Sequence, residues 1–163
     1  MAFPTVAATN TNATTTAAKS HTVSLPTGVV SGDLLIIFFT GGGDASAITW
    51  PGGWTSLYSV ASTSKDQVRM SAAYRVADGT EGASITVTTA IAETSAHNSY
   101  RIAAYQAVPE AATAQGSEIL ANPPALTPSW GVADTLWLVA YGCSNIDNQS
   151  AYPAYRIIRR NGA

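Results

Sequence analysis

Leu34–Phe39 is an unbroken run of six apolar residues, and turn-forming residues lie on both sides of it. Pro26 and Gly32 precede the run, and three consecutive glycines follow it at 41–43. A short apolar run with such boundaries is typical of a strand buried on both faces. It is far shorter than the roughly 20 residues of a membrane span, so no membrane partner is expected. We predict that residues 33–40 form the central strand of the core.

Alternating polar and apolar positions predict further strands. In Ser20–Leu25, Val23 and Leu25 share one face and polar residues occupy the other. The other predicted strands are 54–58, 68–76, 84–88, 100–108 and the strongly apolar 134–142. Residues 92–99 are mostly polar and are predicted to form a loop. No window has helical periodicity, so the predicted fold class is all-β.

Two stretches lack the apolar residues of a core. Residues 1–19 are rich in Thr and Ala and almost uncharged, and they are predicted to form an extended arm or the first strand. Residues 109–130 contain prolines that exclude helix and central strand, so they are predicted to be a long Pro-rich crossover connection. Such a connection is typical of Greek-key β-sandwiches. We predict one antiparallel β-sandwich domain spanning residues 1–163.

The chain is poor in charge. Charged residues make up 11 % of it, against roughly 25 % in ordinary soluble domains. The net charge of −2 and the pI near 5.5 provide no basic face for nucleic acid. Arg156, Arg159 and Arg160 form one basic cluster, interpreted as a solvated edge that discourages strand pairing or as a contact for an acidic partner. Such a chain either keeps an unusually neutral surface or has much of its surface covered by neighbours.

Cysteine usage and the N-terminus give two further expectations. Cys143 is the single cysteine, so an internal disulfide and a cysteine zinc cluster are excluded. Its neighbours are small, which favours a buried thiol. The N-terminal residues lack a basic segment followed by an apolar one, so no secretory signal is predicted and synthesis in the cytoplasm is expected.

No catalytic constellation emerges from the sequence, and we predict that the protein is not an enzyme. A Gly-x-Ser-x-Gly elbow is absent, and His21 and His97 lie in polar settings that predict solvated side chains. Glu93 lies near His97, but neighbours in a loop seldom form an acid–base pair. Asp33 and Asp134 each begin a predicted strand and are candidates for the paired carboxyl groups of a glycosidase. Asp at such a junction more often caps backbone donors, and we favour that role.

Metal and cofactor sites are likewise not predicted. The loop Gly41–Asp44 lacks the Lys-Ser/Thr of a phosphate loop. No metal-ligand spacing is present, although Asp44 offers a weak oxygen ligand for calcium. Trp50, Trp54 and Tyr152 flank tight turns, where their rings either stack on sugars or cap one end of the core. Packing is the more common role of such rings.

Four stretches together resemble a β-sandwich module of tailed-bacteriophage virions, over about residues 20–142. They are Leu25–Leu35, Pro51–Thr55, Tyr74–Glu81 and Ala133–Trp137. The resemblance implies a jelly-roll-like sandwich with an extended N-terminal segment. Related modules serve as capsid cement (decoration) proteins and as parts of tail appendages. The chain ends soon after the last matched strand, so a partner is expected to complete an edge.

The resemblance implies a structural role in a virion. We expect a cement protein on the outer surface of the capsid, made in the host cytoplasm, which binds the major capsid protein across subunit boundaries as a homotrimer. No cofactor, metal or nucleic acid is expected. The alternative is a receptor- or carbohydrate-binding tail module. The predicted contact residues are Phe3, Pro4, Thr5, Val6, Arg156, Arg159 and Arg160; for the alternative they are Trp50, Trp54 and Tyr152.

Overall fold

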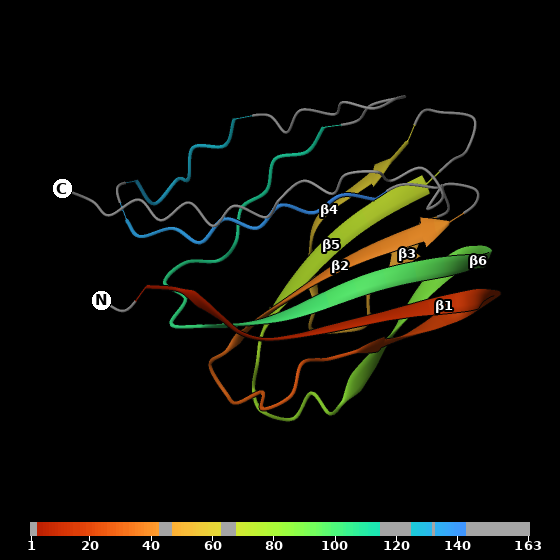
Figure 1. Cartoon of the computed structure of the whole chain (residues 1–163), viewed down its shortest axis with the longest axis horizontal. Helices are drawn as coiled ribbons and strands as arrows, with labels where there is room; N and C mark the ends of the chain where they lie inside the picture. Colours follow the sequence, from red (N-terminus) through yellow and green to blue (C-terminus); the bar gives the residue numbers. More distant parts are fainter. Residues whose placement is uncertain (1–2, 43–46, 63–67, 115–124, 132, 143–163) are drawn as a thin grey trace.

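The structure is a computed structural model that describes residues 3–42, 47–62, 68–114, 125–131 and 133–142. The described residues form one antiparallel sheet of six strands and contain no helix (Figure 1), which confirms the predicted all-β class. The jelly-roll-like sandwich stays a prediction. The strands are β1 (Thr5–Ser24), β2 (Leu34–Gly42), β3 (Ile48–Thr49), β4 (Thr55–Ala61), β5 (Val68–Val76) and β6 (Ser84–Ala103).

The central apolar run forms β2, as predicted. The sheet order is β1-β6-β2-β5-β4, with β3 paired to β6, so β2 has a neighbour on each side. Its side chains alternate between two buried clusters. Leu35, Ile37 and Phe39 define face A of the sheet, and Leu34 and Ile36 define face B. Burying each of these large side chains stabilises the fold by roughly 1.5–3 kcal/mol.

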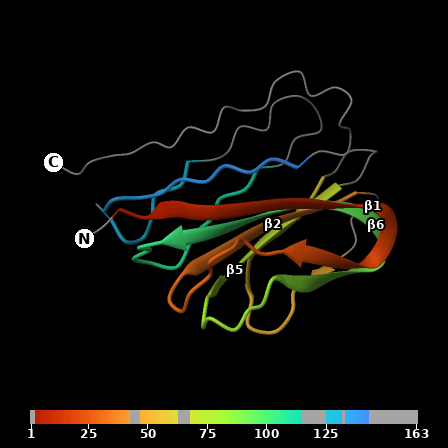
Figure 2. The ribbon, with the colours of Figure 1, turned by 60° about the horizontal axis from the view of Figure 1, so that its bottom comes forward.

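The β1–β6 ribbon bends back over face A. The second half of β1 pairs with the first half of β6, whereas the first half of β1 pairs with the part of β6 that lies beside β2. Figure 2 shows β1 reversing direction at one end of the molecule. Side chains join the two layers, because Ser99 Oγ donates to the carbonyl of Ser24 (2.7 Å) and Asn10 Nδ2 donates to the carbonyl of Leu25 (3.3 Å). Val23 and Val87 from the returning ribbon are fully buried in the face A cluster.

Face B is covered by irregular segments that follow β6. Leu136 and Leu138 pack against its cluster, and the segments run beside the sheet in Figure 1. The prediction of a strand at 134–142 is wrong, because these residues adopt no strand conformation. The prediction at 100–108 is wrong beyond Ala103, where Ala104 takes a positive φ of 58° and ends the strand. Within the described ranges, no helix has the length and apolar character needed to cross a bilayer.

Two polar stretches form long strands. Residues 92–99 lie inside β6, so the predicted loop is wrong. Of the two possibilities for residues 1–19, the structure has 5–19 within β1, which continues without a break into the predicted strand at 20–25. Backbone hydrogen bonds to β6, more than apolar burial, hold these residues in place. Hydrophobic periodicity therefore could not reveal them.

Candidate functional site

The two histidines are buried, which corrects their interpretation as solvated side chains. His21 is 0 % exposed and His97 is 2 % exposed, and both rings contact Phe39 on face A. His21 makes an edge contact at 5.2 Å between ring centroids, and His97 stacks at 6.3 Å. Burial lowers the pKa of both imidazoles, and the neighbouring His21 lowers the pKa of His97 further.

Two hydroxyl groups flank the imidazole ring of His21. The Ser95 hydroxyl lies 2.9 Å from His21 Nδ1, and the Thr89 hydroxyl lies 3.1 Å from His21 Nε2. Thr89 Oγ1 in turn donates to the carbonyl of Ile91. A serine beside an imidazole is the arrangement of an activated nucleophile, but both groups here are buried in the layer between the sheet and the ribbon. The hydroxyls satisfy the hydrogen-bonding needs of a ring that has left water.

Histidine 97 has a different environment. Its two ring nitrogens have no hydrogen-bond partner among the described residues. Glu93 is buried on the same side of β6, four residues away, so the two side chains share a face without adjoining along the strand. No group of three or more His, Cys, Asp or Glu residues in the described ranges is arranged to hold a metal ion.

The two candidate carboxylates of a glycosidase, Asp33 and Asp134, lie in different environments. Asp33 is 8 % exposed, and its Oδ2 accepts from the backbone N–H of Val30 (3.0 Å) and lies 3.7 Å from Arg101 Nη1. This is the capping role that the sequence favoured. Asp134 instead lines a cavity on face B. The loop position Asp44 lies outside the described residues.

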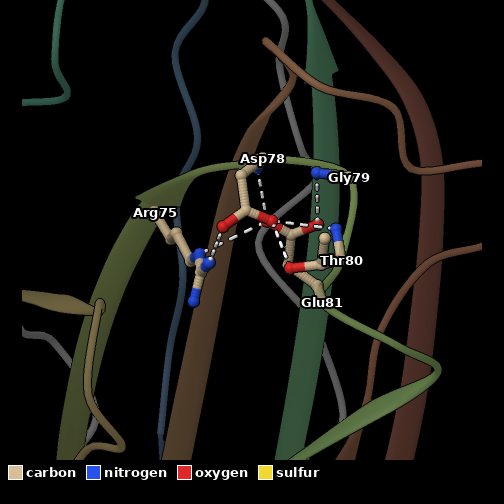
Figure 3. A network of polar contacts seen from close by, with 5 residues as sticks. All are labelled: Arg75, Asp78, Gly79, Thr80 and Glu81. Atoms are coloured by element: carbon tan, nitrogen blue, oxygen red, sulfur yellow. Dashed lines mark hydrogen bonds and ion pairs between the residues drawn. The ribbon is translucent and has the colours of Figure 1, made fainter.

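The resemblance motif Tyr74–Glu81 forms a braced turn between β5 and β6 (Figure 3). The Glu81 carboxylate accepts from the backbone N–H groups of Asp78 (2.6 Å) and Gly79 (3.1 Å) and lies 3.3 Å from Arg75 Nε. The Asp78 carboxylate accepts from the N–H and hydroxyl of Thr80 and from Arg75 Nη2. These hydrogen bonds, first those from Thr80, lower the pKa of Asp78. The motif therefore shapes a turn.

The tryptophans of the proposed sugar site contact the core. Trp50 and Trp54 are half-buried against the face A cluster, and their rings stack at 6.3 Å with an interplanar angle of 24°. Trp50 Nε1 donates to Ser71 Oγ (3.2 Å), and its ring meets Phe39 edge-on. Both rings thus have packing partners, while Tyr152 lies outside the described residues. Carbohydrate binding stays a prediction.

The predicted contact residues at the N-terminus belong to the folded body. Phe3 is half-buried and Pro4 is buried, and Thr5 and Val6 begin β1 opposite Ala103 and Ile102. Pro4 also lines the cavity on face B, a space of about 330 Å³ whose walls include Leu34, Ile36, Ile102, Leu136 and Leu138. Arg156, Arg159 and Arg160 lie outside the described residues.

The outer side of β1 is the longest strand edge that no described strand covers. β1 pairs with β6 along one side, and no described strand pairs with its other side. Lys19 is its only charged residue. Alternate N–H and C=O groups of an edge strand point away from its neighbour, and they form a template for another strand. Sequence analysis missed this surface, because the Thr/Ala-rich segment was not recognised as one strand of 20 residues.

No family model, no curated protein and no solved structure matches the chain. The similarity to phage virion modules therefore stays a prediction.

Proposed function

We propose that the protein is a structural component of a tailed-phage virion, a cement protein that binds the major capsid protein on the outer surface of the head. The observation that carries the proposal is the nearly uncharged β1, whose outer side meets no described strand. A protein that acts by binding neighbouring proteins over an extended surface needs accessible backbone groups and small side chains at that surface. It needs no chemistry of its own.

The placement of reactive side chains supports the same proposal. His21, His97 and Glu93 are buried, and the serine beside His21 is only 6 % exposed. Asp33 closes a turn and contacts Arg101. These five side chains are thus enclosed by the fold or brace one of its turns. The predicted homotrimer is part of the proposal, since a threefold arrangement would let one cement unit bridge several capsid subunits.

The test is binding to undecorated heads. The purified chain is mixed with heads that lack their outer proteins, and the mixture is sedimented and then heated. Co-sedimentation and a higher temperature of head rupture are expected. A variant with Thr27, an exposed turn residue, changed to Lys serves as a control that should bind equally. If the purified chain does not co-sediment with the heads but binds to a glycan array, the alternative of a tail module is favoured instead.

A further inference from the structure

Only part of the outer side of β1 is regular enough to accept a strand. Register shifts interrupt the pairing of β1 with β6 between Val6 and Ala8, between Thr14 and Ala18, and between Ala18 and Ser20. Between them lies the edge window, Ala8–Thr14, which pairs residue by residue with Arg101–Ser95 of β6. An uninterrupted segment of this length is sufficient for strand addition.

The edge window also lacks the usual protection against pairing. Natural proteins guard edge strands with charged residues, prolines or bulges. The window has none of these within it, and its residues are Ala, Thr and Asn alone. Thr9, Thr11, Asn12 and Ala13 are exposed. The window therefore requires a partner strand that is extended, neutral and free of proline.

The window itself meets this requirement. Its three central residues, Asn10-Thr11-Asn12, have the same sequence in both directions, whereas the outer pairs Thr9/Ala13 and Ala8/Thr14 differ. If two copies pair antiparallel with Thr11 at the centre, Thr11 faces Thr11, and Asn10 of each copy faces Asn12 of the other. Cross-strand Thr–Thr pairs are favourable neighbours on a sheet. The amides of Asn10 and Asn12 already bond within their own chain, to the carbonyl of Leu25 and the N–H of Ala13, so the Thr11 pair is the favourable contact of this register.

We propose that the edge window pairs with the same window of a second copy, antiparallel and with a two-fold axis at Thr11. The contact is isologous, the form found in most symmetric protein pairs. This contact does not depend on binding to the capsid. It is also compatible with the proposed homotrimer, because neighbouring threefold axes of a closed shell are related by two-fold axes. Each pair would join two sheets through their β1 strands.

Single cysteines test the register. In a Cys143→Ser background, Thr11→Cys is expected to form a disulfide-linked dimer. Directly opposed residues have Cα atoms about 4.5–5.5 Å apart, within the range that a disulfide spans. Thr9→Cys alone should not cross-link, because its copy would lie four residues along the strand, about 13 Å away. A mixture of Thr9→Cys and Ala13→Cys should give the mixed dimer.

Each outcome decides the proposal. Selective cross-linking of Thr11→Cys and of the Thr9/Ala13 mixture supports it. Equal cross-linking at all positions, cross-linking of Thr9→Cys alone, or none overturns it. Independently, Thr11→Lys places two like charges opposite each other and should weaken self-association about fivefold in sedimentation equilibrium, while Thr27→Lys should not change it. Equal effects of the two lysines would also refute the pairing. Head binding by a chain that fails these tests would leave the cement proposal intact.

Discussion

Acidification should destabilise the protein because both of its histidines are neutral and buried in the native state. His21 and His97 lie on face A against Phe39, with at most 2 % of either residue exposed. Burial lowers the pKa of each below the ordinary value of 6.5. Unfolding returns both imidazoles to water, where they bind protons at their ordinary pKa.

The sign and size of the effect follow from this difference. Above pH 6.5, neither the folded nor the unfolded protein binds protons at these histidines, and the stability is fully present. As the pH falls from 6.5 through the lowered folded pKa values, the unfolded protein binds protons first and stability is lost. One proton changes the free energy of unfolding by about 1.4 kcal/mol per pH unit, so two give a limiting slope of about 2.7 kcal/mol per pH unit. The pKa of Asp78 is lowered from 3.8, so its contribution is lost only at more acidic pH.

Urea unfolding followed by tryptophan fluorescence, at steps between about pH 5 and about pH 7.5, measures this slope. The variant His97→Phe keeps a ring of similar shape that can stack on Phe39 and removes one titrating group. Its slope should fall to about half that of the wild type, close to 1.4 kcal/mol per pH unit. His97 is the better site to change because its ring nitrogens have no described hydrogen-bond partner.

A free energy of unfolding that stays constant from about pH 6.5 down to about pH 5 would refute the reasoning. So would a slope in His97→Phe equal to that of the wild type, since the proton uptake would then come from other groups. Glu93, buried on the same face, is the titratable group to examine in that case.

Three further substitutions test the packing and the turns by urea unfolding. Ile37→Ala should cost about 3 kcal/mol because Ile37 is 0 % exposed in the face A cluster, whereas Val139→Ala, at 45 % exposure, should change stability by less than about 0.5 kcal/mol. Gly53→Ala should cost about 1–2 kcal/mol because φ is +84° there, and Gly52→Ala, which meets open space, is its near-neutral control. Glu81→Gln should cost about 1–2 kcal/mol because the carboxylate holds two backbone N–H groups of its turn. Equal effects within either pair, or a neutral Glu81→Gln, would contradict these assignments.

The apolar part of the fold was predictable from the sequence. The run Leu34–Phe39 lies in β2 and is buried on both faces, and the predicted strand 68–76 matches β5. Asp33 also has the capping role that its position favoured. In each case a local pattern specifies the structure, because apolar periodicity and turn residues act over a few positions.

The polar strands were not predictable in the same way. In β6, Glu93, Ser95, His97 and Ser99 alternate on the buried side, where an ordinary strand would carry apolar residues. Their partners lie far away in sequence: Ser95 contacts His21, and Ser99 donates to Ser24. Only the bend of the ribbon brings these groups together, so a local pattern contains no signal for them. The apolar segment at 134–142 shows the converse, since its side chains pack on face B without joining the sheet.

The same polar ribbon explains why β1 suits an interface. Residues 5–18 contribute little to the buried apolar clusters, with Val6 as their main contact, so backbone pairing to β6 holds this half of the strand. In an edge strand of this kind, half of the backbone N–H and C=O groups bond to β6 and the other half point away from it. A second strand on the outer side would satisfy those groups without disturbing the core, because the side chains involved are small and neutral. The Thr and Ala side chains of this strand therefore add little to the apolar core, and because they are small and neutral they allow a neighbouring strand to pair with its edge.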